Sequence, residues 1–189
     1  MEELALHILD IAENSIRVGA RNVEIRIEED LENDRLTIIV RDDGAGMDET
    51  TKQRALDPFF SNWPERSDPD WPKPQSGVSP RKRVGLGLPL LADAARRAGG
   101  AIAIKSESGG GTEVVATFEH GHVDRQPLGN VAQTMATLVV GNPEVEFRLT
   151  HRKPRGEWSL DTREIKRSLG STPINSGEGI RVIRTILGT

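Results

Sequence analysis

The chain has 189 residues, and its 25 Lys+Arg against 29 Asp+Glu give a formal net charge of -4. This balance argues against a nucleic-acid-binding protein, and the absence of cysteine excludes disulfide frameworks, cysteine-based zinc sites and cysteine nucleophiles. No apolar run is as long as a membrane span, and the acidic, amphipathic N-terminus does not have the composition of a signal peptide. We therefore expect a soluble, cytoplasmic protein that binds neither nucleic acid nor membrane.

The first part of the chain alternates between helical and extended patterns. Apolar residues at spacings of three and four predict a helix over residues 2–18, which ends near Gly19. Alternation of Val and Ile with charged residues predicts a half-buried strand over 23–28, and the apolar run 36–40 predicts a buried strand. A glycine-containing loop follows, and a short helix is expected over 49–56.

Residues 61–83 have a different composition, with five prolines and no periodicity. Proline breaks both helices and strands, and a long loop in a compact domain is usually a lid or a linker. After this segment, Pro89 suits the first turn of a helix that a glycine pair ends. Two strands joined by a glycine-rich turn are expected over 101–107 and 112–119.

Residues 120–189 have the pattern of a small α+β unit. They contain 10 basic and 7 acidic residues, whereas residues 1–119 have an acidic excess, and this asymmetry indicates two functional parts. The pattern predicts a helix, two strands and two further helices, in this order: 130–140, 145–149, 158–160, the segment between Asp161 and Gly170, and 180–187. We therefore expect an N-terminal domain over 1–119 and an α+β extension of unknown role over 120–189.

Three short motifs contain groups that can bind a nucleotide. Asp10 and Asn14 lie four residues apart, hence on one face of the first helix, where a carboxylate and an amide can orient a water and complete a magnesium shell. Asp42-Asp43-Gly44-Ala45-Gly46 offers carboxylates to the amine of a base and glycines that allow close backbone approach. Gly85-Leu86-Gly87 precedes a helix N-terminus, where amides attract phosphate, and Arg81-Lys82-Arg83 lies just upstream.

Taken singly, each motif also has an ordinary explanation. The polar pair of the first helix is typical of a solvated helix edge, and the acidic loop is typical of a surface turn. The glycine pair lacks the lysine ending of a P-loop and does not follow a strand, as the dinucleotide fingerprint does.

The combination is far more specific than its parts. In chain order the sequence contains Asp10-x-x-x-Asn14, Asp42-Asp43-Gly44-Ala45-Gly46, Asp57-Pro58-Phe59-Phe60, Gly85-Leu86-Gly87-Leu88 and Gly110-Gly111-Thr112. This series resembles the N, G1, F, G2 and G3 boxes of the GHKL superfamily of gyrase, heat-shock chaperone, histidine kinase and mismatch-repair ATPases, and is closest to the histidine-kinase-like and anti-sigma-factor members. The resemblance spans residues 4–118 and implies an α/β two-layer sandwich with ATP between the helices and a lid over 61–83.

The resemblance also implies a role for each matching residue, with ATP and Mg²⁺ as cofactors. Asn14 matches the magnesium-binding asparagine, Asp10 occupies the place of the water-activating residue, and Asp42 matches the aspartate that binds the adenine amine. The other matches belong to the purine pocket, the F box that supports the lid, the phosphate loop and the threonine near the adenine: Gly44, Gly46, Phe59, Phe60, Arg83, Gly85, Leu86, Gly87, Leu88 and Thr112.

The sequence departs from the family pattern in three ways. Asp10 stands where the family usually has the longer glutamate, which predicts slow or absent hydrolysis because general-base geometry tolerates little displacement. Arg83 stands where sensor kinases often have a further glycine. The N box begins almost at Met1, so we expect no phospho-accepting helix pair upstream, and we interpret His7 as a packing or surface residue.

Outside these motifs, His120 and His122 would be a poor metal site without a third ligand, and a turn at the end of a strand is the better interpretation. His151 is expected to be solvated in a basic turn. Lys153 and Arg155 in that turn could reach a phosphate, as a lysine from a second domain does in some relatives.

Three functions are compatible with these features. The first is an ATP-binding regulatory protein with a nucleotide-gated lid, possible slow magnesium-dependent hydrolysis, and an unidentified protein as partner. The second is a serine or histidine protein kinase that acts on a partner. The third is a non-catalytic, nucleotide-dependent interaction module, which the short side chain of Asp10 favours.

Overall fold

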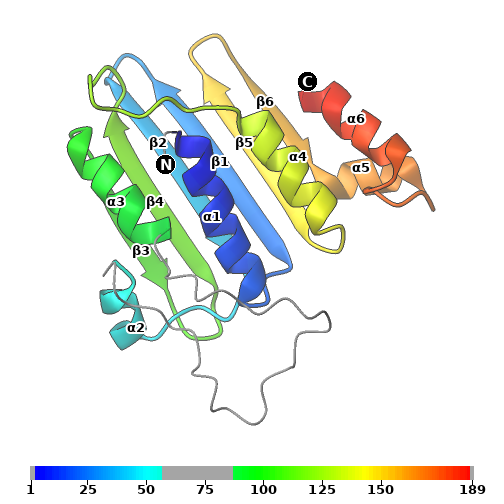
Figure 1. The fold of residues 1–189 in the computed structure, drawn as a ribbon, viewed down its shortest axis with the longest axis horizontal. Coiled ribbons are helices and arrows are strands. Elements are labelled where there is room, and N and C mark those ends of the chain that lie inside the picture. Colours follow the sequence, from blue (N-terminus) through cyan, green and yellow to red (C-terminus); the bar gives the residue numbers. More distant parts are fainter. Residues whose placement is uncertain (1–2, 57–86, 188–189) are drawn as a thin grey trace, which may run out of the picture.

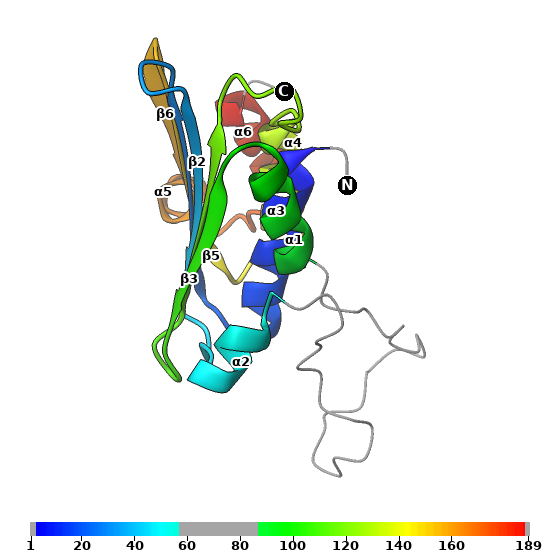
Figure 2. The same ribbon diagram turned by 90° about the vertical axis from the view of Figure 1, so that its left-hand side faces the viewer.

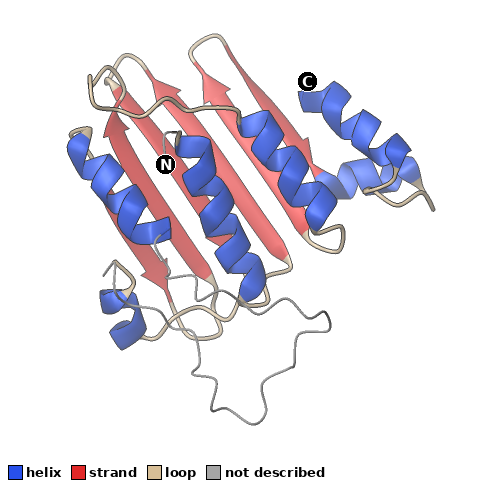
Figure 3. Cartoon of the chain, viewed as in Figure 1, coloured by secondary structure: helices blue, strands red, loops and turns tan. Residues whose placement is uncertain are grey.

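The computed structural model describes residues 3–56 and 87–187. Within these ranges, helices and strands follow one another as the periodicity predicts (Figures 1 and 3). Their bounds are α1 (Leu4–Arg17), β1 (Asn22–Asp30), β2 (Arg35–Asp42), α2 (Glu49–Arg54), α3 (Gly87–Arg97), β3 (Ala101–Ser106), β4 (Thr112–Glu119), α4 (Val131–Gly141), β5 (Glu146–Lys153), β6 (Gly156–Asp161), α5 (Thr162–Leu169) and α6 (Gly177–Leu187).

The strands form one six-stranded sheet in the order β3-β4-β2-β1-β5-β6. The neighbouring strands are antiparallel except for β1 and β5, which are parallel. Figure 2 shows α1, α3, α4 and α6 on the same side of this sheet. The structure confirms the predicted two-layer α/β sandwich.

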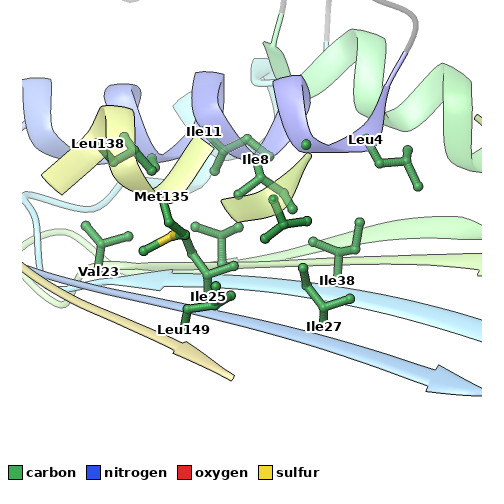
Figure 4. Close-up of a cluster of buried hydrophobic side chains, with 14 of the residues drawn as sticks. Leu4, Ile8, Ile11, Val23, Ile25, Ile27, Ile38, Met135, Leu138 and Leu149 are labelled. Atoms are coloured by element: carbon green, nitrogen blue, oxygen red, sulfur yellow. The ribbon is translucent and has the colours of Figure 1, made fainter. Parts of the chain in front are cut away.

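Alternation along the strands explains why one face of the sheet binds helices. Val23, Ile25 and Ile27 of β1 are buried, whereas the residues between them are charged. The buried set packs against α1 and α4 through residues such as Ile8 and Met135 (Figure 4). Complete burial of one such side chain stabilises the fold by about 1.5–3 kcal/mol.

The segment after residue 119 continues the same sheet and core. The expected boundary coincides with the end of β4 at Glu119, and the chain then crosses through α4 to place β5 parallel to β1. Phe147 and Leu149 of β5 belong to the same buried cluster as the N-terminal strands. The C-terminal part therefore contributes structure directly beside the helix that carries Asp10 and Asn14.

The opposite face of the sheet carries a row of alternating charges. Strand registers place one residue of each strand in this row, in the order Lys105, Glu113, Arg41, Glu24, Arg148 and Asp161. Ion pairs of 3.2 Å join Lys105 to Glu113 and Arg148 to Asp161. Opposite charges on adjacent strands stabilise the sheet by roughly 0.2–1 kcal/mol per pair. The charged side chains also allow this face of the sheet to be exposed to water.

Candidate functional site

The predicted purine-binding residue, Asp42, is held in one orientation. It ends β2, and its Oδ2 accepts a hydrogen bond of 2.6 Å from Ser15 Oγ of α1. Its Oδ1 accepts a bond of 2.9 Å from the backbone N–H of Gly44. Both oxygens retain a lone pair, because a carboxylate oxygen can accept two hydrogen bonds.

The two predicted purine-pocket glycines lie in tightly packed places. A Cβ on Gly44 would lie 3.0 Å from Val18 Cγ2 and 3.1 Å from Asp42 Oδ1. Gly46 has φ +66°, and a Cβ there would overlap the carbonyl oxygen of Glu107. The loop therefore requires glycine at Gly46, for close packing and for its left-handed backbone, whereas a side chain at Gly44 would displace the side chains of Val18 and Asp42 slightly.

Backbone hydrogen bonds fasten this loop to α1 on one side and to the β3–β4 turn on the other. Ala45 N–H donates to the carbonyl of Val18 at 3.1 Å, and Ala45 carbonyl accepts from Gly109 N–H at 2.7 Å. Met47 N–H donates to Ser106 Oγ at 2.8 Å. The loop after β2 is thus fixed at three points.

The predicted magnesium and water-activating residues face the start of α3. A Cβ on Gly87 would lie 3.2 Å from Asp10 Cβ and 3.6 Å from Asn14 Nδ2. The first residue of α3 therefore rests on the face of α1 that carries both groups. Asn14 Oδ1 accepts a bond of 2.7 Å from Arg17 Nη1, and Leu88 packs against the core.

Thr112 joins the same group through strand register. It is the direct partner of Asp42 across β2 and β4, and its Oγ1 lies 2.9 Å from Ser106 Oγ. The structure thus brings together six predicted site residues along α1 and at the adjoining strand ends: Asp10, Asn14, Asp42, Gly44, Gly87 and Thr112. Gly46 lies two residues after Gly44, in the loop between β2 and α2.

The remaining predicted site residues lie outside the described residues. They are the F-box pair Phe59 and Phe60, the phosphate-loop residues Arg83, Gly85 and Leu86, and the lid over 61–83.

Sequence reasoning missed Ser15 as a site residue. The helical periodicity placed it on the buried stripe of α1, and it is buried with only 4% of its surface exposed. Its position directly after Asn14, on the helix opposite a strand-end carboxylate, was the available signal. A hydroxyl on a buried stripe needs a partner, because a buried polar group without a hydrogen bond is costly.

Asp43 has a structural role, whereas its neighbour Asp42 is the predicted purine-binding residue. Its Oδ1 accepts bonds of 2.8 Å from the N–H groups of Arg21 and Asn22, and its Oδ2 accepts from Asn22 Nδ2 at 2.5 Å. Burial acts to raise the pKa of this carboxyl, but the hydrogen bonds from Asn22 and Arg21 outweigh it and hold the pKa below its ordinary value. Asp43 therefore ties the loop to the start of β1.

The prediction that His151 is solvated was wrong. β5 runs on to Lys153 because it pairs with β1 along its length, and His151 is only 2% exposed. Its Nε2 lies 2.7 Å from Glu29 Oε1, and its ring packs on Trp158 with centroids 5.7 Å apart. Burial lowers the pKa of His151, although the hydrogen bond with Glu29 acts in the opposite direction.

His120 and His7 also lie within hydrogen-bond distance of other side chains. His120 lies in the turn after β4, with Nε2 3.4 Å from Glu29 Oε2. His7 is buried, with Nε2 3.0 Å from Gln126 Oε1. Among the described residues, no group of three or more His, Asp or Glu side chains could hold a metal ion by itself.

Lys153 and Arg155 lie at the end of the sheet far from Asp42, the predicted purine-binding residue. Val23 is opposite Asp42 in the register, whereas Lys153 follows the residue opposite Glu28, at the far end of β1. At about 3.3 Å per residue, the separation along the strand is roughly 17–20 Å. The contact of this turn with a phosphate stays a prediction, because the phosphate-loop residues Arg83, Gly85 and Leu86 lie outside the described residues.

No helix in the ranges 3–56 and 87–187 is long and apolar enough to cross a membrane.

Comparisons with known proteins agree with this geometry. Residues 2–122 match the family model described as histidine kinase-, DNA gyrase B- and HSP90-like ATPase. No curated protein matches the chain significantly.

Several solved structures are similar to the chain. The N-terminal domain of a DNA repair protein has a TM-score of 0.54 at 15% identity, over 99% of this chain and 57% of that one. An Aquifex aeolicus MutL ATPase domain complexed with ADP has 0.46 at 16%, over 85% and 63%. The mycobacterial sensor histidine kinase MprB has 0.42 at 18%, over 59% and 66%.

The chain thus spans between 57% and 66% of the length of these solved chains. The first of them shares the fold of this chain over 99% of this chain's residues. The family model covers well over half of the chain and includes every motif from the N box to the G3 box. The chain therefore belongs to the family of histidine kinase-, DNA gyrase B- and HSP90-like ATPases, whose model matches residues 2–122.

Proposed function

We propose that this protein is an ATP-dependent regulator that binds Mg-ATP along α1 and changes its interaction with a protein partner according to the bound nucleotide. One observation carries this proposal. Ser15 of α1 holds the purine-binding carboxylate of Asp42, while the preceding residue, Asn14, faces the start of α3 at Gly87. A single helix therefore links the purine end of the site to the phosphate end.

The orientation of Asp42 favours adenine over guanine. An ionised carboxylate is an acceptor only, so it binds the exocyclic amine of adenine and is repelled by the carbonyl oxygen at the same position of guanine. Because Ser15 and Gly44 already donate to this carboxylate, its remaining lone pairs have a fixed direction. Fixed acceptors reject a mismatched base more strongly than mobile ones.

The residues at the phosphate end fit a magnesium ion. Asn14 offers an amide oxygen, a hard ligand of the kind that Mg²⁺ accepts together with water and phosphate oxygens. Arg17 donates to that oxygen, so one of its two lone pairs remains for the metal. A bound magnesium would neutralise phosphate charge. In the structure Asn14 turns its Nδ2 to Gly87 and its Oδ1 to Arg17, so the amide would have to rotate to give its oxygen to a metal beside α3.

Asp10 is the proposed general base for hydrolysis. It lies on the same face of α1 as Asn14, against Gly87, where a water could stand between it and the terminal phosphate. Its side chain is about 1.5 Å shorter than that of glutamate, and a displacement of this order can cost roughly 100-fold in rate. We therefore propose slow turnover, with the lid over 61–83 gated by the presence of nucleotide rather than by rapid hydrolysis.

The direct test is calorimetric titration with Mg-ATP and Mg-GTP. We expect the protein to bind Mg-ATP more tightly than Mg-GTP, and Asp42→Asn to weaken Mg-ATP binding. Glu32→Gln, an exposed change in the turn between β1 and β2, is the matched control and should bind like the wild type. Absence of binding at millimolar Mg-ATP would refute the proposal.

Labelled ATP separates the remaining alternatives. Release of free phosphate identifies an ATPase, and transfer of the label to a co-purified protein identifies a kinase. Binding without either product identifies a non-catalytic module.

A further inference from the structure

A hollow of about 230 Å³ opens beside the loop after β2, on the face of the sheet that carries Glu24, Arg41 and Arg148. The ends of β2, β1 and β5 and the first turn of α5 line it. Asp42 contributes to its rim, but the Asp42 carboxylate is bound to Ser15 of α1. Sites for drug-sized ligands usually measure about 300–1,000 Å³, so the hollow suits a smaller molecule than a nucleotide.

Three guanidinium groups line the hollow, from Arg41, Arg148 and Arg163. The guanidinium of Arg41 makes no hydrogen bond or ion pair with any residue in the described ranges. Arg148 uses its Nε to bind Asp161, and Arg163 uses its Nη2 to bind Asn22. Since each guanidinium has five N–H donors, most of the donors around the hollow remain available.

The carboxylates of the hollow, in contrast, already have partners. Asp43 accepts three hydrogen bonds from Arg21 and Asn22. Asp161 accepts from the backbone N–H of Arg163 and from Arg148 Nε.

Two further carboxylates have partners outside the hollow. Glu146 accepts from Thr162 Oγ1 at 2.7 Å and pairs with Lys166 at 2.8 Å. Glu24 pairs with Arg26 at 3.2 Å. Asp42 is the fifth carboxylate of the hollow and accepts from Ser15 and Gly44. With Arg26 and Lys166 included, five basic groups face five carboxylates, and the unused donors are those of the arginines, above all Arg41.

We propose that this hollow binds a small oxyanion, a phosphate or a compact dicarboxylate, with Arg41 as its principal contact. Arg41 is the residue before Asp42 on β2, and Asp43 lies on the rim, so the ligand sits directly behind the loop that binds the purine. Guanidinium groups bind carboxylate and phosphate in bidentate geometry.

Nuclear magnetic resonance titration of the 20.7 kDa chain tests the proposal. The probes are inorganic phosphate in one arm and succinate in the other, at constant ionic strength. We expect one of them to shift the backbone signals of Arg41, Asn22 and Arg148. Arg41→Gln should weaken that binding by about tenfold or more, the loss of a hydrogen bond to a charged group.

Arg35→Gln is the matched control, because Arg35 is exposed on the same strand and face but at the far end. It removes the same charge and should change the affinity less than about twofold, as expected of a distant surface charge. Equal weakening by both variants would show non-specific attraction and overturn the proposal. So would the absence of shifts at millimolar probe.

A third arm separates the hollow from the nucleotide site. Saturating Mg-ADP should leave the Arg41 signals responsive to the oxyanion. If Mg-ADP abolishes the response, the probe occupies the nucleotide site and the proposal fails. If the protein binds no nucleotide, the proposed function fails, but the first two arms still test the binding of the oxyanion.

Discussion

Ser15→Ala removes the side-chain donor that orients the Asp42 carboxylate, the proposed purine-binding group. Ser15 Oγ lies 2.6 Å from Asp42 Oδ2, and the serine is almost fully buried. A hydrogen bond to a charged group contributes about 1.5–3 kcal/mol. Alanine is a better helix former than serine by up to about 0.5 kcal/mol, so the net loss of stability should be about 1–2.5 kcal/mol.

This loss should appear in two separate measurements. For a chain of this size, 1 kcal/mol changes the Tm by roughly 2–4 °C, so calorimetric melting of Ser15→Ala should occur about 2–10 °C below the wild type. Asp42 then keeps only the bond from Gly44 N–H and can rotate. Reorientation that costs 1–2 kcal/mol weakens Mg-ATP binding by a factor of about 5–30.

Ser15→Thr is the matched control because it keeps a hydroxyl on the same carbon. It should retain most of the Mg-ATP affinity, even if its extra methyl group lowers the Tm in this buried position. The reasoning would be refuted if Ser15→Ala bound Mg-ATP as tightly as the wild type, or if Ser15→Thr lost as much affinity as Ser15→Ala.

Three further predictions follow from the same structure. Gly46→Ala combines a left-handed backbone with a collision against the carbonyl of Glu107, so it should lower the unfolding free energy by about 1–3 kcal/mol or more in urea titration. Gly141→Ala in α4 has open space and should be neutral or stabilising, which makes it the control. Asp10→Asn should reduce ATP hydrolysis in a phosphate-release assay by about 100-fold or more, whereas Asp10→Glu should increase it; unchanged rates in both would exclude Asp10 as the base. Because burial lowers the pKa of His151 below its ordinary value of 6.5, the unfolded chain takes up a proton first as the pH falls. Stability should therefore decrease below about pH 6.5, and His151→Gln should show a smaller decrease in urea titrations at pH 7 and pH 5.5.

Much of the fold was predictable because its local patterns agree with the global arrangement. The alternation in residues 23–28 marks both the strand and its buried face, and the structure places Val23, Ile25 and Ile27 against the helices. The spacing of Asp10 and Asn14 likewise guaranteed that both lie on one face of α1. Periodicity predicts such features because neighbouring residues alone determine them.

The position of the C-terminal strands was not predictable in this way. The pattern of residues 145–149 predicted a strand, but only the tertiary structure shows that β5 lies parallel to β1 in the same sheet. That pairing extends the strand to Lys153 and buries His151 beside Glu29. From the sequence alone, a charged, basic stretch is expected to be an exposed turn. In the structure, pairing with a neighbouring strand makes it part of the sheet.

The sequence by itself determined the order of the elements, the two-layer class and the nucleotide-binding motifs, because periodicity and short signatures depend on residues close together in the chain. The tertiary structure alone decided which distant residues meet. The bond from Ser15 to Asp42 spans 27 positions, and Arg163 reaches Asn22 across 141. Strand register and helix packing set such contacts, and they result from the burial of the whole apolar core rather than from any local pattern.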